Sequence, residues 1–206
     1  MSNYDITSVA ELREVISEPN PLVAGKVSDA LDDYASAYIG AAPLLFMATY
    51  DSDGRVDISP KGDAPGFVLT ETATELLVPE RKGNKLNYGF LNILETGRIG
   101  LIFVVPGSRE TLRVNGRATI SRDPELLARL AADDKPALLC TKVQVEESFF
   151  HCGKAMIRSH LWDQTHWPKD FDPGLAKQLG AKMRLSKEQT AALDQALEDD
   201  YRNELY

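Results

Sequence analysis

The spacing of hydrophobic positions divides the chain into a helical start, a strand-rich middle and a helical end. Residues 8–40 repeat apolar side chains at helical intervals, and Ser8 and Glu11 have the spacing of a capping box. Pro19 and Pro21 are expected to stop this first helix. One face of a second predicted helix carries Val27, Leu31, Tyr34 and Tyr38. The sequence therefore predicts N-terminal helices across residues 8–40.

From Leu44 onward, short apolar or alternating stretches predict antiparallel strands. The predicted strands cover residues 44–50, 55–59, 66–70, 75–80, 98–105, 111–120 and 137–150. Helices are expected at 87–95 and from Pro124 onward. Gly116 interrupts an alternating strand, which suggests a bulge or a barrel corner. Hairpin spacing of this kind favours a closed or half-closed antiparallel barrel of about six strands over a parallel sheet.

Helix and loop return after the last predicted strand. Three residues at i,i+4 spacing would share one side of a helix: Lys154, Arg158 and Trp162. Ser186 and Gln189 are placed to cap a final helix whose outer face is acidic. No linker-like stretch separates the strands. Residues 1–206 are therefore expected to form a single domain with a C-terminal helical extension at 151–206.

Charge and composition exclude several classes of function. The chain of 206 residues has a net charge of −8, which argues against a general nucleic-acid binder but allows a small phosphorylated ligand. Cys140 and Cys152 give no disulfide framework. The N-terminus is charged where a signal peptide would be apolar, and the apolar stretches are too short to span a bilayer. We therefore expect a cytoplasmic protein that binds neither nucleic acid nor membrane.

Two glycine-rich segments combine cations with groups that can bind an anion. The first lies within "DISPKGDAPGF", where two prolines and two glycines predict a constrained bend, and it contains Ser59, Pro60, Lys61 and Gly62. The second, "PERKGNKLN", contains Arg81, Asn84 and Lys85. Glycines let backbone N–H groups approach an anion, and the cations add charge. The two segments are predicted either to hold a terminal phosphate or to be solvated hairpin ends. Neither matches the P-loop pattern.

Other polar clusters leave alternatives open. Arg113 and Arg117 would share one face of a regular strand, either at a binding site or on a solvated sheet face. Arg158 beside Trp162 suits a planar anionic ligand, although an amphipathic helix explains the pair equally well. The three histidines, His151, His160 and His166, fit no zinc spacing, so no metal site is expected. Cys152 and His151 are sequence neighbours and would point apart, and no catalytic residue is singled out.

Five stretches taken together resemble one known family. They are "MATYDSDGRVDISPKGDAPGF", "PERKGNKLNYGFLNILE", "IGLIFVVPG", "ETLRVNGRATISRDP" and "FFHCGKAMIRSHLW". In this order, from about residue 30 to 170, they resemble the pyridoxamine 5'-phosphate oxidase-like FMN-binding proteins, and most of all a branch of FMN-dependent enzymes of that class. The resemblance implies a six-stranded split β-barrel, usually a homodimer, with FMN bound where the two subunits meet.

The resemblance also implies roles for individual residues. Ser59 and Lys61, with Pro60 and Gly62 on the same stretch, would lie along the flavin ring and its ribityl chain. Arg81, Asn84 and Lys85 would grip the phosphate. Arg113 lies in the most specific segment, "PGSRETLRVNGRA", and Arg158 and Trp162 would reach the flavin from the partner chain. The basic Arg-x-x-x-x-Lys strand of the true oxidases is absent at 57–62, and the chain ends in an acidic helix, so oxidation of vitamin B6 is not expected.

The function expected from residues and resemblance together is that of an FMN-dependent oxidoreductase. Hydride would pass between flavin N5 and an unknown small-molecule substrate, while the protein holds and tunes the ring. Two alternatives stay open: a protein that stores or senses FMN without turnover, and a split barrel that holds a deazaflavin or haem.

Overall fold

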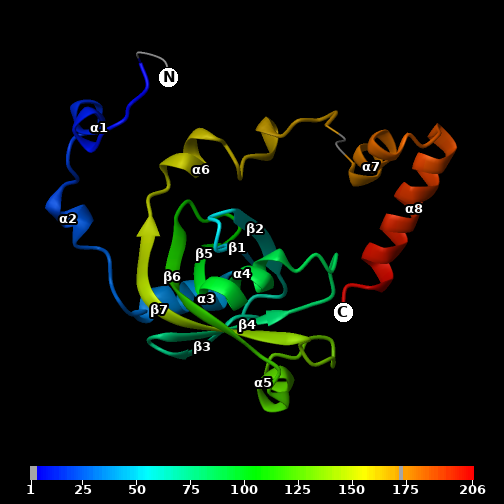
Figure 1. Ribbon diagram of the computed structural model, residues 1–206, viewed down its shortest axis with the longest axis horizontal. Coiled ribbons are helices and arrows are strands. Elements are labelled where there is room, and N and C mark those ends of the chain that lie inside the picture. Colours follow the sequence, from blue (N-terminus) through cyan, green and yellow to red (C-terminus); the bar gives the residue numbers. More distant parts are fainter. Residues whose placement is uncertain (1–3, 172–173) are drawn as a thin grey trace.

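The computed structural model describes residues 4–171 and 174–206, which form a curved antiparallel sheet flanked by helices (Figure 1). The strands are β1 (Leu44–Tyr50), β2 (Val56–Gly62), β3 (Leu69–Thr72), β4 (Glu75–Glu80), β5 (Arg98–Val104), β6 (Thr111–Ser121) and β7 (Leu139–His151). The helices are α1 (Val9–Val15), α2 (Pro21–Ala24), α3 (Asp33–Ala41), α4 (Tyr88–Thr96), α5 (Pro124–Arg129), α6 (Lys154–Arg158), α7 (Leu175–Met183) and α8 (Lys187–Asn203), with a short 3-10 helix at Gln164–His166.

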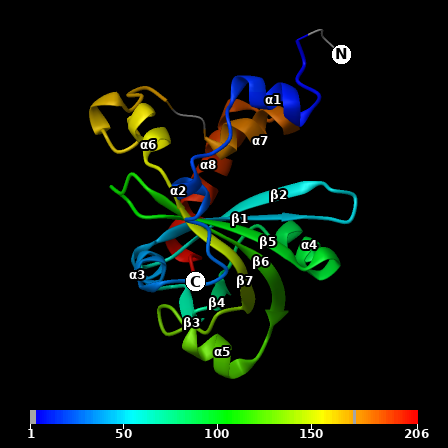
Figure 2. The same ribbon diagram turned by 90° about the vertical axis from the view of Figure 1, so that its left-hand side faces the viewer.

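The described strands form one sheet in the order β2-β1-β5-β6-β7-β4-β3. The expectation of a mainly β, antiparallel sheet with flanking helices is confirmed. The expected count of six strands is wrong, because each of the seven stretches with strand periodicity forms a strand and all seven pair into one sheet. β2 and β3 are its edges, and Figure 2 shows how strongly the sheet curls between them.

The core lies on the concave side of the sheet and under two helices. Alternate residues of β5, β6 and β7 point into it, and Phe103, Leu112 and Val143 are completely buried. α3 packs against β3, β6 and β7, while α4 packs against β1, β2, β5 and β6. Burial of large apolar side chains stabilises such a core by about 1.5–3 kcal/mol each.

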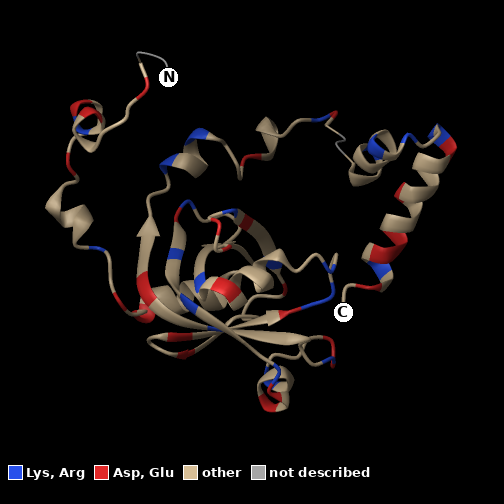
Figure 3. Cartoon of the chain, viewed as in Figure 1, with Lys and Arg blue, Asp and Glu red and all other residues tan. Residues whose placement is uncertain are grey.

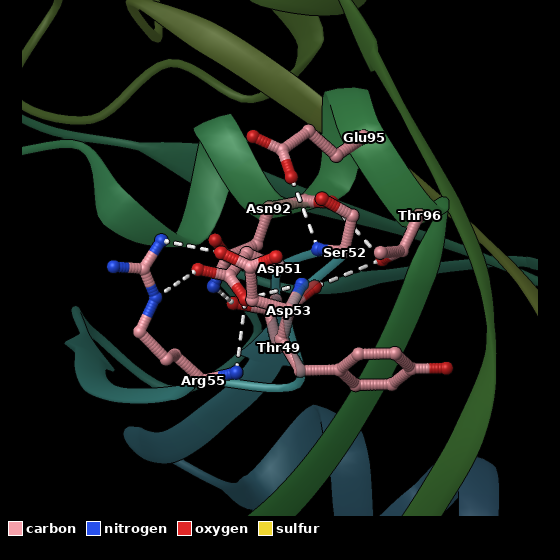
Figure 4. A network of polar contacts seen from close by, with 9 residues as sticks. Thr49, Asp51, Ser52, Asp53, Arg55, Asn92, Glu95 and Thr96 are labelled. Atoms are coloured by element: carbon pink, nitrogen blue, oxygen red, sulfur yellow. Dashed lines mark hydrogen bonds and ion pairs between the residues drawn. The ribbon is translucent and has the colours of Figure 1, made fainter.

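Polar contacts fix α4 to the hairpin of β1 and β2 (Figure 4). Asn92 of α4 donates from Nδ2 to Thr49 Oγ1 over 3.0 Å, and both side chains are buried. Glu95 accepts a 3.0 Å hydrogen bond from the Ser52 amide in the hairpin turn. Since a buried amide side chain without partners would be costly, these bonds specify one position of α4 on the hairpin. The N-terminal end of α4 is thereby held beside β2.

The stretch that the sequence predicts to bend is instead straight strand. β2 continues through Ser59, Pro60 and Lys61 to Gly62, paired with β1 from Tyr50 back to Leu44. Proline is tolerated there because β2 is an edge strand. The chain turns only afterwards, at residues 63–66, where Gly66 has a φ of 88°. Alternation along β2 therefore decides which side chains of this stretch share a face.

The N-terminal helices differ in their bounds from those predicted. Pro21 does not stop a helix but begins α2, in the first-turn position where its missing N–H costs nothing. The predicted helix across Val27–Tyr38 starts only at Asp33, because Asp32 caps α3 through the Ala35 amide. Before that cap, Ser28 forms an isolated antiparallel bridge with Ser148 of β7. Val27 and Leu31 therefore precede the helix.

Further sequence predictions of local structure are confirmed at both ends of the chain. Ser8 caps α1 by accepting from the Glu11 amide. Ser186 and Gln189 form the predicted capping box of α8. α1 and α2 extend from the sheet on one side, and α7 and α8 on the other (Figure 1). No helix among residues 4–171 and 174–206 is both long and apolar enough to cross a membrane.

The bulge that Gly116 suggests is present, but the extra residue belongs to the neighbouring strand. Asn115 pairs with Glu147 and Gly116 with Val145, so Glu146 of β7 is the residue without an opposite partner. The β7 backbone comes so close that a Cβ on Gly116 would lie 1.9 Å from the Gln144 carbonyl oxygen. Because of the bulge, Glu146 and Glu147 both reach arginines of β6, at Arg117 and Arg113.

The close approach predicts a large effect of a single methyl group. Gly116→Ala is expected to lower the free energy of unfolding by about 3 kcal/mol, because the new Cβ overlaps a backbone that the ladder holds in place. The matched control is Gly40→Ala in α3, where nothing lies within 4 Å of the added Cβ. That change is expected to raise stability by about 0.4–1 kcal/mol. Urea denaturation curves of the parent and the two variants, recorded at the same protein concentration, measure both effects. A Gly116→Ala protein as stable as the parent would contradict this account of the bulge.

Candidate functional site

A hollow of about 850 Å³ lies between β2 and β4, and it is here called the β2–β4 hollow. Its wall combines β2, the end of β4, the loop that follows β4 and the first turn of α4, and the C-terminal end of α8 closes one side. The lining residues are Met47, 57–62, Phe67, 79–90, Leu138, Leu139, Asp200 and Glu204. Volumes of about 300–1,000 Å³ are usual for sites that bind small molecules and cofactors.

Most of the residues predicted to form a site line this hollow. Ser59, Pro60, Lys61, Gly62, Arg81, Asn84 and Lys85 are all in its wall, so the structure brings the two glycine-rich segments together. Arg113, Arg158 and Trp162 are not among the residues that line it. The two segments stand about twenty positions apart in sequence and meet because the sheet curls until β2 faces β4.

Lys61 is the cation that joins the two sides of the hollow. Its ammonium group forms an ion pair with Glu80 at the end of β4, and the two side chains are only 17% and 18% exposed. The same ammonium lies 5.1 Å from the centre of the Phe90 ring of α4. On β2, Asp57, Ser59 and Lys61 alternate with exposed Ile58 and Pro60, and Ser59 Oγ donates to Asp57 over 3.0 Å. One face of β2 therefore lines the hollow with polar groups.

Arg81 is the most buried cation of the following loop. Its Nε donates to Asp63 over 2.7 Å, and the Arg81 side chain is 16% exposed. Asp63 also accepts from the Ala64 amide and from the hydroxyl of Tyr206, each over 2.8 Å. Burial alone would raise the pKa of Asp63, but the hydrogen bonds from Arg81, Ala64 and Tyr206 lower it below its usual value. The carboxylate is thus held ionised and keeps the guanidinium in place.

One nitrogen of that guanidinium has no partner. Arg81 Nη1 is buried and makes no hydrogen bond to any residue of the described chain. A buried charged donor without a partner is costly, by about 1–3 kcal/mol, and native structures usually satisfy such groups with water, an ion or a ligand. Arg81 lines the hollow, and its Nη1 is a buried donor that no described residue satisfies.

The C-terminus contributes acidic groups to the same loop. Lys82 Nζ lies 2.5 Å from a carboxylate oxygen of Glu204, which follows α8, and both side chains are about half exposed. The hydrogen bond from Lys82 lowers the pKa of Glu204. Figure 3 shows the basic residues of the loop after β4 beside the acidic end of α8. Exposed pairs of this kind contribute only about 0–1 kcal/mol, so they are easily exchanged.

The loop between β4 and α4 has an unusual backbone. Lys85 and Asn87 have φ values of 61° and 57°, in the left-handed region that residues other than glycine rarely adopt. Asn84 Oδ1 accepts a 3.0 Å hydrogen bond from the Leu86 amide, which stabilises the turn between them. Such conformations persist where surrounding contacts impose them, often beside ligands. Asn84 and Lys85 both line the hollow.

Arg113 lies in a different cluster, on the outer side of β6. Its Nη2 donates to Glu147 over 2.7 Å, and the guanidinium carbon is 4.2 Å from the centre of the Phe149 ring. His151 stands next to that ring on β7, and burial, followed by repulsion from Arg113 and Lys26, lowers its pKa. Arg113 Nε is buried without a hydrogen-bond partner in the part of the chain described.

Arg158 and Trp162 are not stacked along one helix as the spacing predicts. α6 ends at Arg158, and the chain then turns through His160, which has a φ of 50°. The Trp162 side chain contacts the loop between β5 and β6, where its Nε1 donates to the Ser108 carbonyl over 2.7 Å. The i,i+4 rule fails here because the helix has only five residues and does not continue to Trp162.

An apolar patch covers the outer face of the sheet near β2. Ladder pairing puts Phe46 beside Ile102 and Tyr50 beside Val56, while Ile58 pairs with the small Ala48 between them. These five large side chains are all exposed: Phe46, Tyr50, Val56, Ile58 and Ile102. Contiguous exposed apolar patches of this kind mark interaction surfaces.

The groups that sequence reasoning missed are the carboxylates. Asp63 and Glu80 neutralise the two buried cations of the β2–β4 hollow, and Glu204 neutralises Lys82. Asp63 lies two positions after Lys61, and Glu80 directly precedes Arg81, so their closeness in sequence to predicted cations was the available signal. Glu204 lies 122 residues from Lys82 and gave no such signal.

Several solved structures are similar to part of this chain. Among solved structures, the chain is similar to HupZ from Group A Streptococcus (18% identity, TM-score 0.48, covering 58% of this chain and 93% of that one). It is also similar to an FMN-binding protein from Syntrophomonas wolfei (14%, TM-score 0.43, covering 56% and 82%). A third similar structure is a protein of the pyridoxinephosphate oxidase family from Clostridium acetobutylicum (13%, TM-score 0.43, covering 58% and 86%).

The comparison with curated proteins finds no match. The family model described as pyridoxamine 5'-phosphate oxidase matches residues 31–152, which include all seven strands and the β2–β4 hollow except its C-terminal side. That match covers more than half of the chain, and the protein therefore belongs to the pyridoxamine 5'-phosphate oxidase family.

Proposed function

We propose that the protein binds FMN in the β2–β4 hollow and acts as an FMN-dependent oxidoreductase. The observation that carries the proposal is the buried Arg81 Nη1, a charged donor without a partner in the wall of a hollow of about 850 Å³. A phosphate offers three strong acceptor oxygens to such a donor. Asn84 and Lys85 stand in the same wall and would complete the phosphate site. Membership of the family supports FMN as the phosphorylated ligand.

The carboxylates of the hollow decide where a phosphate would bind. Lys61 and Arg81 are held by Glu80 and Asp63 in pairs that are largely buried, and replacing those partners would be costly. Lys82 is held by Glu204 in an exposed pair, which a phosphate dianion would replace at little cost. The phosphate is therefore assigned to the Arg81–Lys85 loop. Glu204 is its competitor in the ligand-free chain.

Lys61 and Ser59 are assigned to the ring and ribityl chain of the cofactor. Both lie on the inward face of β2, together with Asp57. The ion pair with Glu80 fixes the Lys61 ammonium, so little side-chain entropy remains to be lost when a ligand binds. When bound, the flavin would supply the hydride chemistry, while these residues orient it and exclude water. No residue of the hollow is assigned as a general acid or base.

We further propose that two copies associate through the apolar outer patch. The patch of Phe46, Tyr50, Val56, Ile58 and Ile102 belongs to β1, β2 and β5, so the strand that lines the hollow on one face carries part of the patch on the other. A two-fold dimer buries the same patch on both copies. Arg158 and Trp162, which do not line the hollow of their own chain, would then be available to the cofactor of the partner.

The phosphate site is tested by two variants that break the same ion pair. Arg81→Met removes the donor, and FMN affinity is expected to fall by about 1.5–3 kcal/mol, the range for a hydrogen bond to a charged group, which is about ten- to a hundredfold. Asp63→Asn breaks the Arg81 pair but leaves the guanidinium, so affinity is expected to equal or exceed that of the parent. FMN titrated into cofactor-free protein and followed by flavin fluorescence measures both.

The two variants separate a binding role from a structural one. If Arg81 only supports the loop, both substitutions weaken FMN binding together, and the proposed phosphate site is wrong. Urea denaturation of each variant shows whether the fold is retained to a similar extent.

Lys61 and Glu80 provide a second test, with effects of opposite sign. A cation near the ring stabilises the more negative, reduced flavin, so Lys61→Met is expected to lower the midpoint potential and Glu80→Gln to raise it. Shifts of about 30 mV correspond to about 1.4 kcal/mol for a two-electron couple. Potentiometric titration of the reconstituted proteins measures them. Should both potentials equal that of the parent while FMN affinity falls, Lys61 contacts the phosphate, which is the same in both redox states.

The dimer is tested on the outer face of β2. Val56→Glu puts a charge in the patch at a position that does not line the hollow, and light scattering at micromolar concentration is expected to change from two chains to one of 22.7 kDa. Thr119→Glu, at an exposed position of β6 outside the patch, is the control and is expected to stay dimeric. A parent protein that is already monomeric would refute the proposed association.

A further inference from the structure

A cluster of potential metal ligands lies after α6, outside the β2–β4 hollow. The cluster consists of His160, Asp163 and His166, which are all exposed. Each residue offers one ligand atom, and these three atoms lie within 4.8 Å of one another. The two imidazole rings are stacked, with centres 4.0 Å apart and an angle of 7° between their planes. None of the three residues lines the hollow assigned to FMN.

The backbone of this segment brings the cluster together without a metal ion. His160 adopts a φ of 50°, which reverses the chain directly after α6. The Asp163 amide donates to the His160 carbonyl over 2.9 Å, and the His166 amide donates to the Asp163 carbonyl over 3.0 Å. The Trp167 indole donates to the Leu161 carbonyl over 2.9 Å and closes the loop. Ligands that are held in place before binding lose less entropy when they bind.

Hydrogen bonds also orient one of the imidazoles. Nδ1 of His166 lies 3.0 Å from one carboxylate oxygen of Asp163 and 3.1 Å from Thr165 Oγ1. The other Asp163 oxygen accepts from the Thr165 amide and hydroxyl. Nδ1 and the carboxylate therefore face the same point, and an ion bound between them would replace their hydrogen bond. This arrangement is not visible in the spacing of the sequence, which matches no helical zinc motif. The turn at His160 and the short 3-10 helix at Gln164–His166 together juxtapose the residues.

We propose that His160, Asp163 and His166 form a binding site for one divalent transition-metal ion. Two imidazole nitrogens and one carboxylate suit Zn²⁺ and its first-row neighbours, whereas Mg²⁺ and Ca²⁺ require oxygen ligands. Bonds to Zn²⁺ of about 2.0–2.2 Å require the three ligand atoms to move closer together and the two stacked rings to turn out of their parallel arrangement. Rotation of the rings about χ2, which is a soft torsion in histidine, provides that movement. Water would complete the coordination, since the site is exposed.

Such an ion would connect the two ends of the segment that carries Trp162. His160 precedes Trp162 and His166 follows it, and Trp162 is bonded to Ser108 of the loop between β5 and β6. The metal would therefore hold the turn that positions this indole. The inference does not depend on the proposed FMN site, because the two share no residue.

The test uses full-length protein without an affinity tag, treated with EDTA and then dialysed. Zn²⁺ is titrated into it in a calorimeter, and one ion per chain is expected to bind. His160→Ala and His166→Ala should each weaken binding at least tenfold, since loss of an outer-shell partner alone typically costs about 10–100-fold in metal affinity. His151→Ala is the matched control: it removes the remaining histidine of the chain and is expected to leave binding unchanged.

A second readout locates the ion. Both tryptophans of the chain, Trp162 and Trp167, adjoin the cluster, so Cu²⁺ or Ni²⁺ at the site is expected to quench their emission in the parent and in His151→Ala but not in His160→Ala. Absence of Zn²⁺ binding to the parent overturns the proposal. So does binding that survives loss of either His160 or His166, or that is lost with His151, because the ion then lies elsewhere or at the surface without specificity.

Discussion

The ion pair between Lys61 and Glu80 joins two strands that are far apart in the sheet. β2 is one edge and β4 is next to the other, with β1, β5, β6 and β7 between them in hydrogen-bonded order. The pair is largely buried, and loss of either partner would leave an uncompensated charge in the wall of the hollow. The curl of the sheet brings the two glycine-rich segments together, and this contact then fixes the separation of the two walls of the β2–β4 hollow.

A balance of charge follows from the same arrangement. Although the chain carries a net charge of −8, the hollow gathers Lys61, Arg81, Lys82 and Lys85 on its wall. Glu80, Asp63 and Glu204 compensate the first three, with burial decreasing from the inner pairs to the exposed one. Inner pairs hold the shape of the site, and the outer pair is the one that the proposed phosphate would replace. The acidic C-terminal helix thus reaches a site formed by residues far from it in sequence.

The sequence predicted the parts of this fold that depend on local pattern. Strand periodicity located β1, β5 and β7, and glycine and capping chemistry located the bulge opposite Gly116 and the start of α8. Prediction from the sequence failed where contacts with neighbouring elements override the local preference of the residues. The prolines and glycines around Pro60 and Gly62 predict a bend, but the hydrogen-bonded ladder with β1 keeps this segment extended. Trp162 lies outside the helix predicted for it because α6 already ends at Arg158. The carboxylate partners of the cations come from strand and helix ends that meet only after folding.

The most direct test of the account is the identity of the small molecule that the protein binds. Gentle denaturation of protein purified from its host, or reconstituted with flavins, releases the bound molecule for mass measurement and an absorption spectrum. The account predicts the mass of FMN, the yellow flavin bands, and one molecule per chain. A deazaflavin or a haem, or failure to retain FMN after reconstitution, would contradict the assignment of the β2–β4 hollow as a flavin phosphate site.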